Sequence, residues 1–285
     1  MKEPAAANTF APKPKKIQTA ACLIVGDEVL GGKIVDTNSN YMAKLCFELG
    51  IDLRKVEVVP DDESEIIDAI LRMSSKYDFV VTSGGIGPTH DDVTFPALAK
   101  AFGLKLELNQ KAYGRMKRLM KPHPGEPPLN WDVDSVVRRA NTRMVILPTD
   151  PSIPAEEQFL FNVDALWAPV TVANGNVYVL PGVPFLFEMQ LQGLKGIMAP
   201  EGGSGLGKRY RVLISTPLSE ASMSDYLTEL AVRMEGEGIK VGVYERWGMS
   251  TNTVTLVGRD LEKIERFIPE VEKSLNGRRI TKEED

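Results

Sequence analysis

Apolar runs of strand length alternate with segments of helical periodicity between residue 17 and about residue 200. Residues 17–26 form a nearly continuous apolar run, which is typical of a strand that is covered on both faces. Residues 36–50 place apolar side chains at helical spacing and end at Gly50, which has the position of a C′ residue. The alternation continues with predicted strands at 51–60 and 78–85 and predicted helices at 63–76 and 93–103. We therefore expect βαβ units in a three-layer, mostly parallel α/β domain.

The second half of this region predicts a helix over 109–120, a proline-rich loop over 121–130 and a strand over 143–148. Asn174-Gly175 joins two β-rich runs and fits a type I′ hairpin turn. A rigid turn at Leu180–Pro184 (LPGVP) then leads into a predicted helix over 185–198. These elements extend the same domain.

A second, smaller unit follows a glycine-rich linker over 202–207. The pattern predicts strands at 209–215, 239–245 and 253–259, and helices at 219–234 and 261–275, with a charged, frayed tail after Asn276. The expected organisation is a disordered tail (1–16), the α/β domain (17–201) and a small α+β domain (208–276). A chain of 285 residues has the length for two such domains.

The net charge of −5 argues against a nucleic-acid-binding surface, which needs clustered Lys and Arg. No run approaches the ~18 apolar residues of a membrane span. The two cysteines, Cys22 and Cys46, stand in apolar stretches and are expected to be buried. We expect a cytoplasmic protein with a small-molecule ligand and no nucleic-acid or membrane partner; a homo-oligomer is a candidate state.

The segment Thr82–Thr94 (TSGGIGPTHDDVT) carries the clearest chemical signal, because it lies where a buried strand meets a helix. Its glycines let the backbone approach a ligand, and successive N–H groups before a helix can hold a phosphate oxygen. A bare glycine pair would more often be only a tight turn. Ligand-binding candidates in this segment are Ser83, Gly84, Gly85, Gly87, Pro88, Thr89 and His90.

The adjacent acids Asp91 and Asp92 follow this loop and suggest a bound cation. Two like charges about 4 Å apart repel by roughly 4 kcal/mol at an effective dielectric near 20, so a carboxylate pair beside a phosphate needs a cation between them. Mg²⁺ commonly bridges carboxylates and substrate phosphates in this way. Asp61 ends the preceding strand at the same sheet edge and is a candidate third carboxylate. Helix capping is the alternative for Asp62 and, less so, for Asp61.

A second glycine-containing segment, Gly26–Asn40 (GDEVLGGKIVDTNSN), follows the first strand. Its glycines permit a loop close to a ligand, and its polar side chains can bind one, although Asp36 could instead cap the next helix. Candidates for ligand binding from this segment and from the PGVP turn are Gly26, Asp27, Glu28, Asp36, Asn38 and Gly182.

Together the three segments resemble the MoaB/Mog (molybdopterin-binding-like) domain family, and its CinA-type branch in particular. That branch carries GDE-L-G…TN, GG-(L/I)-GPT-x-DD-x-T and PG-(V/I)-P, which stand here as GDEVLGG…DTN, GGIGPTHDDVT and PGVP. The resemblance covers roughly residues 18–200, and the His in GGIGPTHDDVTF is most similar to the N-terminal domain of eukaryotic FAD synthases. The residues 148–154 depart from the GTAPG-like segment usual in CinA.

The resemblance implies alternative functions. MoaB/Mog members bind molybdopterin, some adenylylate it with Mg²⁺, and their two key aspartates fall on Asp61 and Asp92. CinA-type and FAD-synthase-type members are described as metal-dependent pyrophosphatases acting on ADP-ribose or FAD. The chain carries neither the deamidase domain that ends many CinA proteins nor the synthetase domain of FAD synthases.

We expect a nucleotide-diphosphate hydrolase in which Asp61 and Asp92 are catalytic and Asp91 and Asp92 place a divalent metal (Mg, Mn or Co), with potassium as a further candidate ion. A protein that binds or adenylylates molybdopterin is the first alternative. A non-catalytic nucleotide-binding module is the second, and retention of the full acid set disfavours it. The expected ligand is a nucleotide or a pterin.

Overall fold

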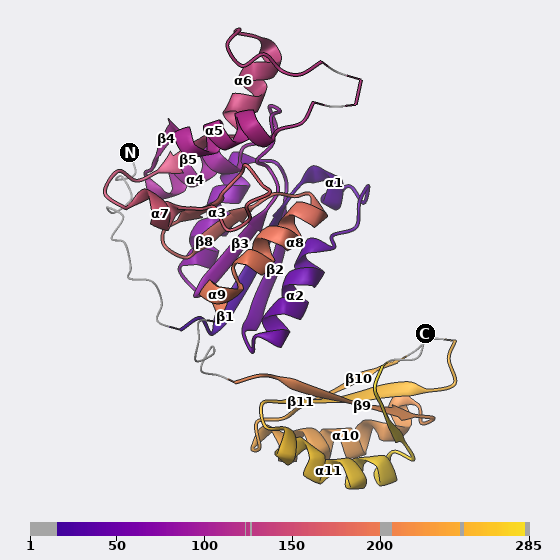
Figure 1. Cartoon of the computed structure of the whole chain (residues 1–285). Helices are drawn as coiled ribbons and strands as arrows, with labels where there is room; N and C mark the ends of the chain where they lie inside the picture. The colour runs from indigo at the N-terminus through magenta and orange to yellow at the C-terminus, as the bar shows by residue number, and fades with distance from the viewer. Residues whose placement is uncertain (1–15, 123, 126, 200–206, 246–247, 283–285) are drawn as a thin grey trace. The chain divides into compact units, whose positions relative to one another are not determined.

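The computed structural model describes residues 16–122, 124–125, 127–199, 207–245 and 248–282 (Figure 1). The chain divides into two compact units, one made of most residues up to Gly205 and one from Leu206 onward. Residues 1–15 of the predicted tail (1–16) and residues 202–206 of the predicted linker (202–207) lie outside the described residues. No helix in the described ranges is long and apolar enough to span a membrane.

The first unit is built on a six-stranded sheet with the order β2-β1-β3-β8-β7-β6. Its strands are β1 (Thr19–Val25), β2 (Asp52–Val59), β3 (Phe79–Ser83), β6 (Phe159–Leu160), β7 (Val170–Ala173) and β8 (Val177–Leu180). The pairs β1–β2, β1–β3 and β3–β8 are parallel, whereas β7 and β6 are antiparallel to their neighbours. The mostly parallel sheet is therefore confirmed. Because β2 and β3 lie on opposite sides of β1, the strand order reverses between β1 and β3.

Helices cover both faces of this sheet, as the alternation of apolar runs and amphipathic segments predicts (Figure 1). The helices in the described part of this unit are α1 (Asp27–Leu30), α2 (Asn38–Glu48), α3 (Glu63–Ser74), α4 (Thr94–Phe102), α5 (Gln110–Leu119), α6 (Val136–Arg143), α7 (Ala155–Gln158), α8 (Pro184–Gly193) and α9 (Lys195–Met198). Figure 1 shows α2 and α8 on one face, where the amide of Gln192 donates to the Tyr41 hydroxyl, and α3 and α4 on the other.

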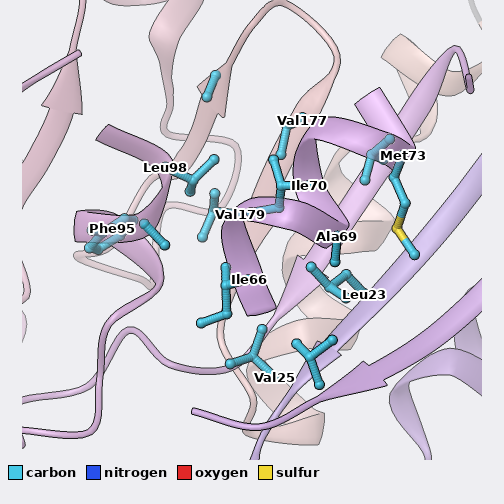
Figure 2. Close-up of a cluster of buried hydrophobic side chains, with 14 of the residues drawn as sticks. Leu23, Val25, Ile66, Ala69, Ile70, Met73, Phe95, Leu98, Val177 and Val179 are labelled. Atoms are coloured by element: carbon cyan, nitrogen blue, oxygen red, sulfur yellow. The ribbon is translucent and has the colours of Figure 1, made fainter. Parts of the chain in front are cut away.

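The main core lies between the sheet and the helices α3 and α4 (Figure 2). Successive β1 side chains point to opposite faces, so Leu23 and Val25 enter this core while Cys22 is buried on the other side. Ile66 and Ile70 project from α3 into the same cluster. Local signals fix where the covering helices begin and end: Asp62 accepts hydrogen bonds from the N–H groups of residues 64 and 65, and a left-handed Gly103 ends α4.

The hairpin between β7 and β8 forms where it is predicted, but its loop holds three residues rather than two. Asn174 and Gly175 both have positive φ, 51° and 71°, and pairing resumes only at Val177. Asn176 is drawn out of the ladder because its side-chain amide donates to the carbonyl oxygens of Ser74 and Tyr77, at 2.8 and 2.9 Å. Tertiary contacts thus lengthen the turn.

Several elements of the first unit differ from the sequence prediction. The predicted strand at 143–148 begins later, at β5 (Ile146–Thr149), because the helix α6 runs to Arg143. β5 pairs with β4 (Lys105–Leu108) in a separate antiparallel two-stranded sheet. The predicted helix over 185–198 is divided at Leu194 into α8 and α9.

The second unit is a four-stranded antiparallel sheet with the order β10-β11-β9-β12. Its elements are β9 (Tyr210–Thr216), α10 (Glu220–Glu235), β10 (Lys240–Tyr244), β11 (Asn252–Gly258), α11 (Leu261–Ser274) and β12 (Arg278–Ile280). The prediction of a frayed tail after Asn276 is wrong, because residues 278–280 pair with β9. A buried hydrogen bond of 2.5 Å from the Thr216 hydroxyl to the Leu275 carbonyl holds the preceding turn.

Candidate functional site

The carboxyl ends of β1, β2, β3 and β8 open into one cavity of about 620 Å³ in the first unit. Open parallel sheets bind ligands at this edge, where the strand order reverses. The wall contains nine of the residues predicted to bind ligand or metal: Glu28, Asp61, Gly84, Gly85, Gly87, Pro88, Asp91, Asp92 and Gly182. The three sequence segments therefore meet at one site.

The glycine loop follows β3 in a conformation that only glycine adopts readily. Gly84 has φ of 107°, and a Cβ there would lie 2.2 Å from the carbonyl oxygen of Val25. The buried Thr94 hydroxyl donates to the Gly84 carbonyl at 2.9 Å, and the Thr94 N–H donates to the Gly85 carbonyl at 3.0 Å. The start of α4 thus holds the loop against the end of β1.

Asp92 holds the second half of the glycine loop through both oxygens of its carboxylate. Oδ1 accepts the Gly87 N–H at 2.5 Å, and Oδ2 accepts the Thr89 N–H at 2.8 Å and the Thr89 hydroxyl at 2.7 Å. The sequence assigned these two N–H groups to a phosphate and Asp92 to a metal. In the structure the carboxylate of Asp92 receives the N–H groups itself.

Acidic side chains gather beside this loop. The Asp61 carboxylate accepts the Asp27 N–H at 2.9 Å. Partial burial raises the pKa of Asp61, and the nearby negative charges of Glu28, Asp27 and Asp91 raise it further, against the lowering effect of that hydrogen bond. A carboxylate that is held among like charges favours either a proton or a cation.

Arg143, at the end of α6, contacts this acidic group, and the sequence analysis did not single it out. Its Nη2 donates to the Asp92 carbonyl oxygen at 3.1 Å. Hydrogen bonding from Thr89 lowers the pKa of Asp91, and the charges of His90 and Arg143 lower it further. Asp91 is thus kept ionised while Asp61 is pushed toward its protonated form.

Asn38 connects the three sequence segments. Its Nδ2 donates to the Ser83 hydroxyl and to the Gly182 carbonyl, both at 2.9 Å, and the side chain is buried. Asn38, Ser83 and Asp36 line a separate cavity of about 50 Å³ that also reaches Glu28 and Gly182. The structure therefore places Asn38 as a connector between the loops beside the main cavity.

Other predicted residues lie outside the wall of the main cavity. Asp36 accepts the Ser39 N–H at 3.0 Å, as a residue that caps α2 would. The His90 side chain is 98% exposed and its Nδ1 lies 3.9 Å from Asp91. The Gly26 N–H donates to the Val59 carbonyl at 3.1 Å and so joins the ends of β1 and β2. Asp27 donates its N–H to Asp61, and Thr89 donates its N–H and hydroxyl to Asp92.

The rest of the wall is largely apolar and was not predicted. It includes Met144, Leu166, Trp167, Ala168, Leu186 and Gln190. Residues 166–168 precede β7, whose first residues lie beside the end of β8 because the two strands are antiparallel. Trp167 packs against the small cluster around Met116, and it also lines the cavity.

Within the described ranges, no three His, Cys, Asp or Glu side chains come close enough together to hold a metal ion by themselves. Mg²⁺ often keeps several waters and binds through one or two carboxylates plus substrate phosphates. The mutual repulsion at Asp61 fits a cation held partly by Asp61, Asp91 or Glu28. The remaining ligands would come from the substrate and water.

Three comparisons place the chain among known proteins. The profile described as "Probable molybdopterin binding domain" matches residues 21–197. A probable FAD synthase of Caenorhabditis elegans is 31% identical over 243 residues, covering 82% of this chain and 45% of that protein. A CinA-like protein of Citrifermentans bemidjiense is 32% identical over 172 residues, covering 60% of this chain and 38% of that protein. The chain therefore spans less than half the length of these two relatives.

A solved structure shares the fold of the first unit at moderate sequence identity. It is the crystal structure of the protein CinA with unknown function from Thermoplasma acidophilum. The TM-score is 0.52 at 28% identity, and the match covers 64% of this chain and 98% of that chain.

Proposed function

The chain belongs to the family of probable molybdopterin binding domains, and on this premise we propose that it hydrolyses a dinucleotide-type diphosphate such as FAD or ADP-ribose with a divalent metal. The family and the similarity to a probable FAD synthase support a nucleotide-related ligand. The reaction and the metal are our inference from the chemistry of the cavity.

One observation carries the proposal: a single cavity combines a glycine loop, acidic side chains and an apolar wall with an aromatic ring. These groups follow the order of the strands, with the acids at the ends of β2 and β1, the loop at β3 and Trp167 before β7. Because neighbouring strands lie about 4.8 Å apart, the step from β1 to β7 is about 14 Å. This arrangement suits an elongated ligand with an anionic centre and a ring.

Different residues around the cavity have different roles in the proposed diphosphate hydrolysis. The remaining N–H groups of the loop would hold one phosphate, while Asp92 and Thr94 keep the loop in place. One or two of Asp61, Asp91 and Glu28 would hold a divalent ion together with water and the substrate phosphates, and the ion would neutralise negative charge on the diphosphate when bound. Asp61 has one oxygen engaged by Asp27, which leaves the other to orient the attacking water. The oxygen of water bonds to one phosphorus as the bond from that phosphorus to the bridging oxygen breaks; the bridging oxygen leaves with the second phosphate, and the protons of the water pass to solvent.

The test is incubation of the purified protein with FAD or ADP-ribose plus Mg²⁺, Mn²⁺ or Co²⁺, and separately with K⁺ added, followed by chromatography. We expect AMP without added ATP, and its loss with a chelator. A molybdopterin adenylyltransferase would instead need ATP and molybdopterin and would release pyrophosphate. Failure to cut any dinucleotide, together with tight molybdopterin binding, would replace the hydrolase with this alternative.

A further inference from the structure

Gln190 brings a buried polar atom to the apolar part of the cavity wall. Its side chain is only 1% exposed, and none of the described residues provides a hydrogen-bond partner for its Oε1. The buried atoms Asn38 Oδ1, Thr82 Oγ1 and Thr171 Oγ1 share this condition, but only Gln190 among these four residues lines the main cavity. An unpaired buried acceptor is costly, so its retention at a ligand cavity points to a donor on the ligand.

The orientation of the Gln190 amide follows from its other end. Nε2 donates to the carbonyl oxygen of Ala168 at 2.9 Å. A carbonyl accepts only from a donor, so the NH₂ group must face Ala168 and the oxygen must be the unpaired end. Ala168 and Gln190 both belong to the cavity wall, so Oε1 is the end of the Gln190 amide that is left for a further donor.

The surrounding backbone is fixed before any ligand binds. The Arg115 guanidinium donates to the carbonyl oxygens of Asp164 and Leu166, both at 2.8 Å, and so anchors the segment that carries Trp167. The side-chain amide of Asn162 donates to the backbone carbonyl oxygen of Gln190 at 2.9 Å. The two segments that form this wall are therefore tied to each other and to α5, and little ordering is left for binding.

Trp167 gives this wall a large, flat surface beside the acceptor. The indole is partly exposed, and the apolar side chains of Met144, Leu166 and Leu186 belong to the same wall. Planar rings stack on aromatic faces, while a single buried acceptor adds selectivity for a ring edge that carries an N–H. A purely apolar ring would leave Gln190 Oε1 without a partner.

We propose that Trp167 and Gln190 form a subsite for a planar nitrogen heterocycle whose edge donates an N–H to Gln190 Oε1. The proposal rests on the proposed function, because the ring would belong to the same diphosphate ligand. Adenine offers such a donor through its exocyclic amino group, and flavin and pterin rings offer one through a ring N–H. Trp167 and Gln190 thereby select the ring, whereas the glycine loop and the acids contact the phosphates.

Ligands without a diphosphate test the subsite apart from hydrolysis. Equilibrium dialysis with the full chain, without metal, compares AMP with the 5′-monophosphate of purine riboside, which lacks the amino group. A second pair compares riboflavin 5′-phosphate with its N3-methyl derivative. We expect the pair that matches the natural ring to show a loss of about 5- to 150-fold in affinity, the usual effect of leaving a buried acceptor unpaired. The pair that responds identifies the ring.

Gln190→Met should abolish the difference within the responding pair, because both ligands then meet a side chain without the acceptor. Gln192→Met is the matched control on the same helix: Gln192 is exposed, donates to Tyr41 and lies outside the cavity wall, so this variant should keep the wild-type discrimination. Circular dichroism checks that both variants fold. Should Gln190→Met fail to fold, the wild-type comparison decides alone.

Absence of binding by all four probes, or equal affinities within both pairs, would overturn the subsite. An equal difference in wild type and folded Gln190→Met would overturn the role of Gln190. Discrimination in these metal-free assays without any dinucleotide cleavage would support the subsite and reject the hydrolase. Cleavage of a dinucleotide without discrimination within either pair of probes would support the hydrolase and reject the subsite.

Discussion

The Oδ1 atom of Asp92 accepts the backbone N–H of Gly87 at 2.5 Å. The carboxylate thereby occupies the position at the glycine loop that a phosphate oxygen would take if the same N–H were its donor. The loop is thus formed and held by an internal anion before any ligand arrives. In the proposed hydrolase Asp92 would act mainly through the shape of the loop, whereas the Asp91 side chain is exposed.

Asp92→Asn should destabilise the protein as well as reduce turnover. An amide retains one acceptor and presents an NH₂ where the carboxylate now accepts three hydrogen bonds, so the expected loss is about 1–3 kcal/mol. Thermal unfolding gives the stability. Asp91→Asn is the matched control: it should keep the melting temperature and weaken cation binding. Equal melting temperatures for wild type and Asp92→Asn would contradict the bracing role.

Gly84→Ala should lower stability and abolish ligand binding. The new Cβ would lie 2.2 Å from the Val25 carbonyl oxygen, and φ of 107° costs a non-glycine residue about 1–3 kcal/mol before that clash is added. Gly103→Ala is the control, since Gly103 also has positive φ but no atom within 4 Å of its Cβ position. That variant should lose only about 1–2 kcal/mol and keep ligand binding. Chemical denaturation measures the free energy of unfolding of both variants. Similar losses of stability in Gly84→Ala and Gly103→Ala would contradict the close packing of Gly84.

Asp61→Asn should keep or slightly raise stability at pH 7 while it lowers turnover. The raised pKa means that the folded state binds a proton more readily than the unfolded state, so the contribution of Asp61 to stability falls as the pH rises through its folded pKa. The substitution removes that cost, which is no more than about 1 kcal/mol for a partly exposed group. The difference in stability between wild type and Asp61→Asn should disappear at a pH below about 4, the pKa of Asp61 in the unfolded chain. A variant less stable than wild type at pH 7 would contradict this electrostatic interpretation.

Arg143→Ala should shift the pH dependence of cation binding. Hydrogen bonding from Thr89 and the charges of His90 and Arg143 lower the pKa of Asp91, so loss of the Arg143 charge raises that pKa. The acidic limit of Mg²⁺ binding, measured by calorimetry, should then move to higher pH. Arg143→Lys keeps the charge and should move it less. An unchanged profile in Arg143→Ala would show that this charge does not act on the cation site.

Gly277→Ala should destabilise the second unit. A Cβ at this position would lie 2.8 Å from the Ser215 carbonyl oxygen and from the Ile214 side chain, where β12 joins β9. Hydrogen exchange should reveal loss of protection at residues 213–215. Gly236→Ala is the control, because the nearest atom to its Cβ position is 3.7 Å away. Unchanged protection in Gly277→Ala would contradict the pairing of β12.

The sequence by itself determined the main alternation of strands and helices, the α/β class and the edge of the sheet at which the glycine loop and the acids meet. These features depend on signals that act within a few residues: apolar runs, the capping Asp62, the left-handed Gly103 and the glycines after β3. The family resemblance drawn from the three motifs is confirmed by the match over residues 21–197. Parallel strands bring such segments together once their order is known.

Only the tertiary structure decided which partner each polar group takes. Asp92 binds the loop because the turn after Gly87 brings its carboxylate to the N–H groups, and Asn176 leaves its ladder because α3 ends beside it. Gln190 and Ala168 are 22 residues apart, and their pairing makes a subsite that neither residue type signals in sequence. Hydrogen bonds are short and directional, so the partner of a side chain depends on its position in the folded chain. Only the folded structure therefore shows that Asp92 has hydrogen-bond donors and that Gln190 Oε1 has none among the described residues.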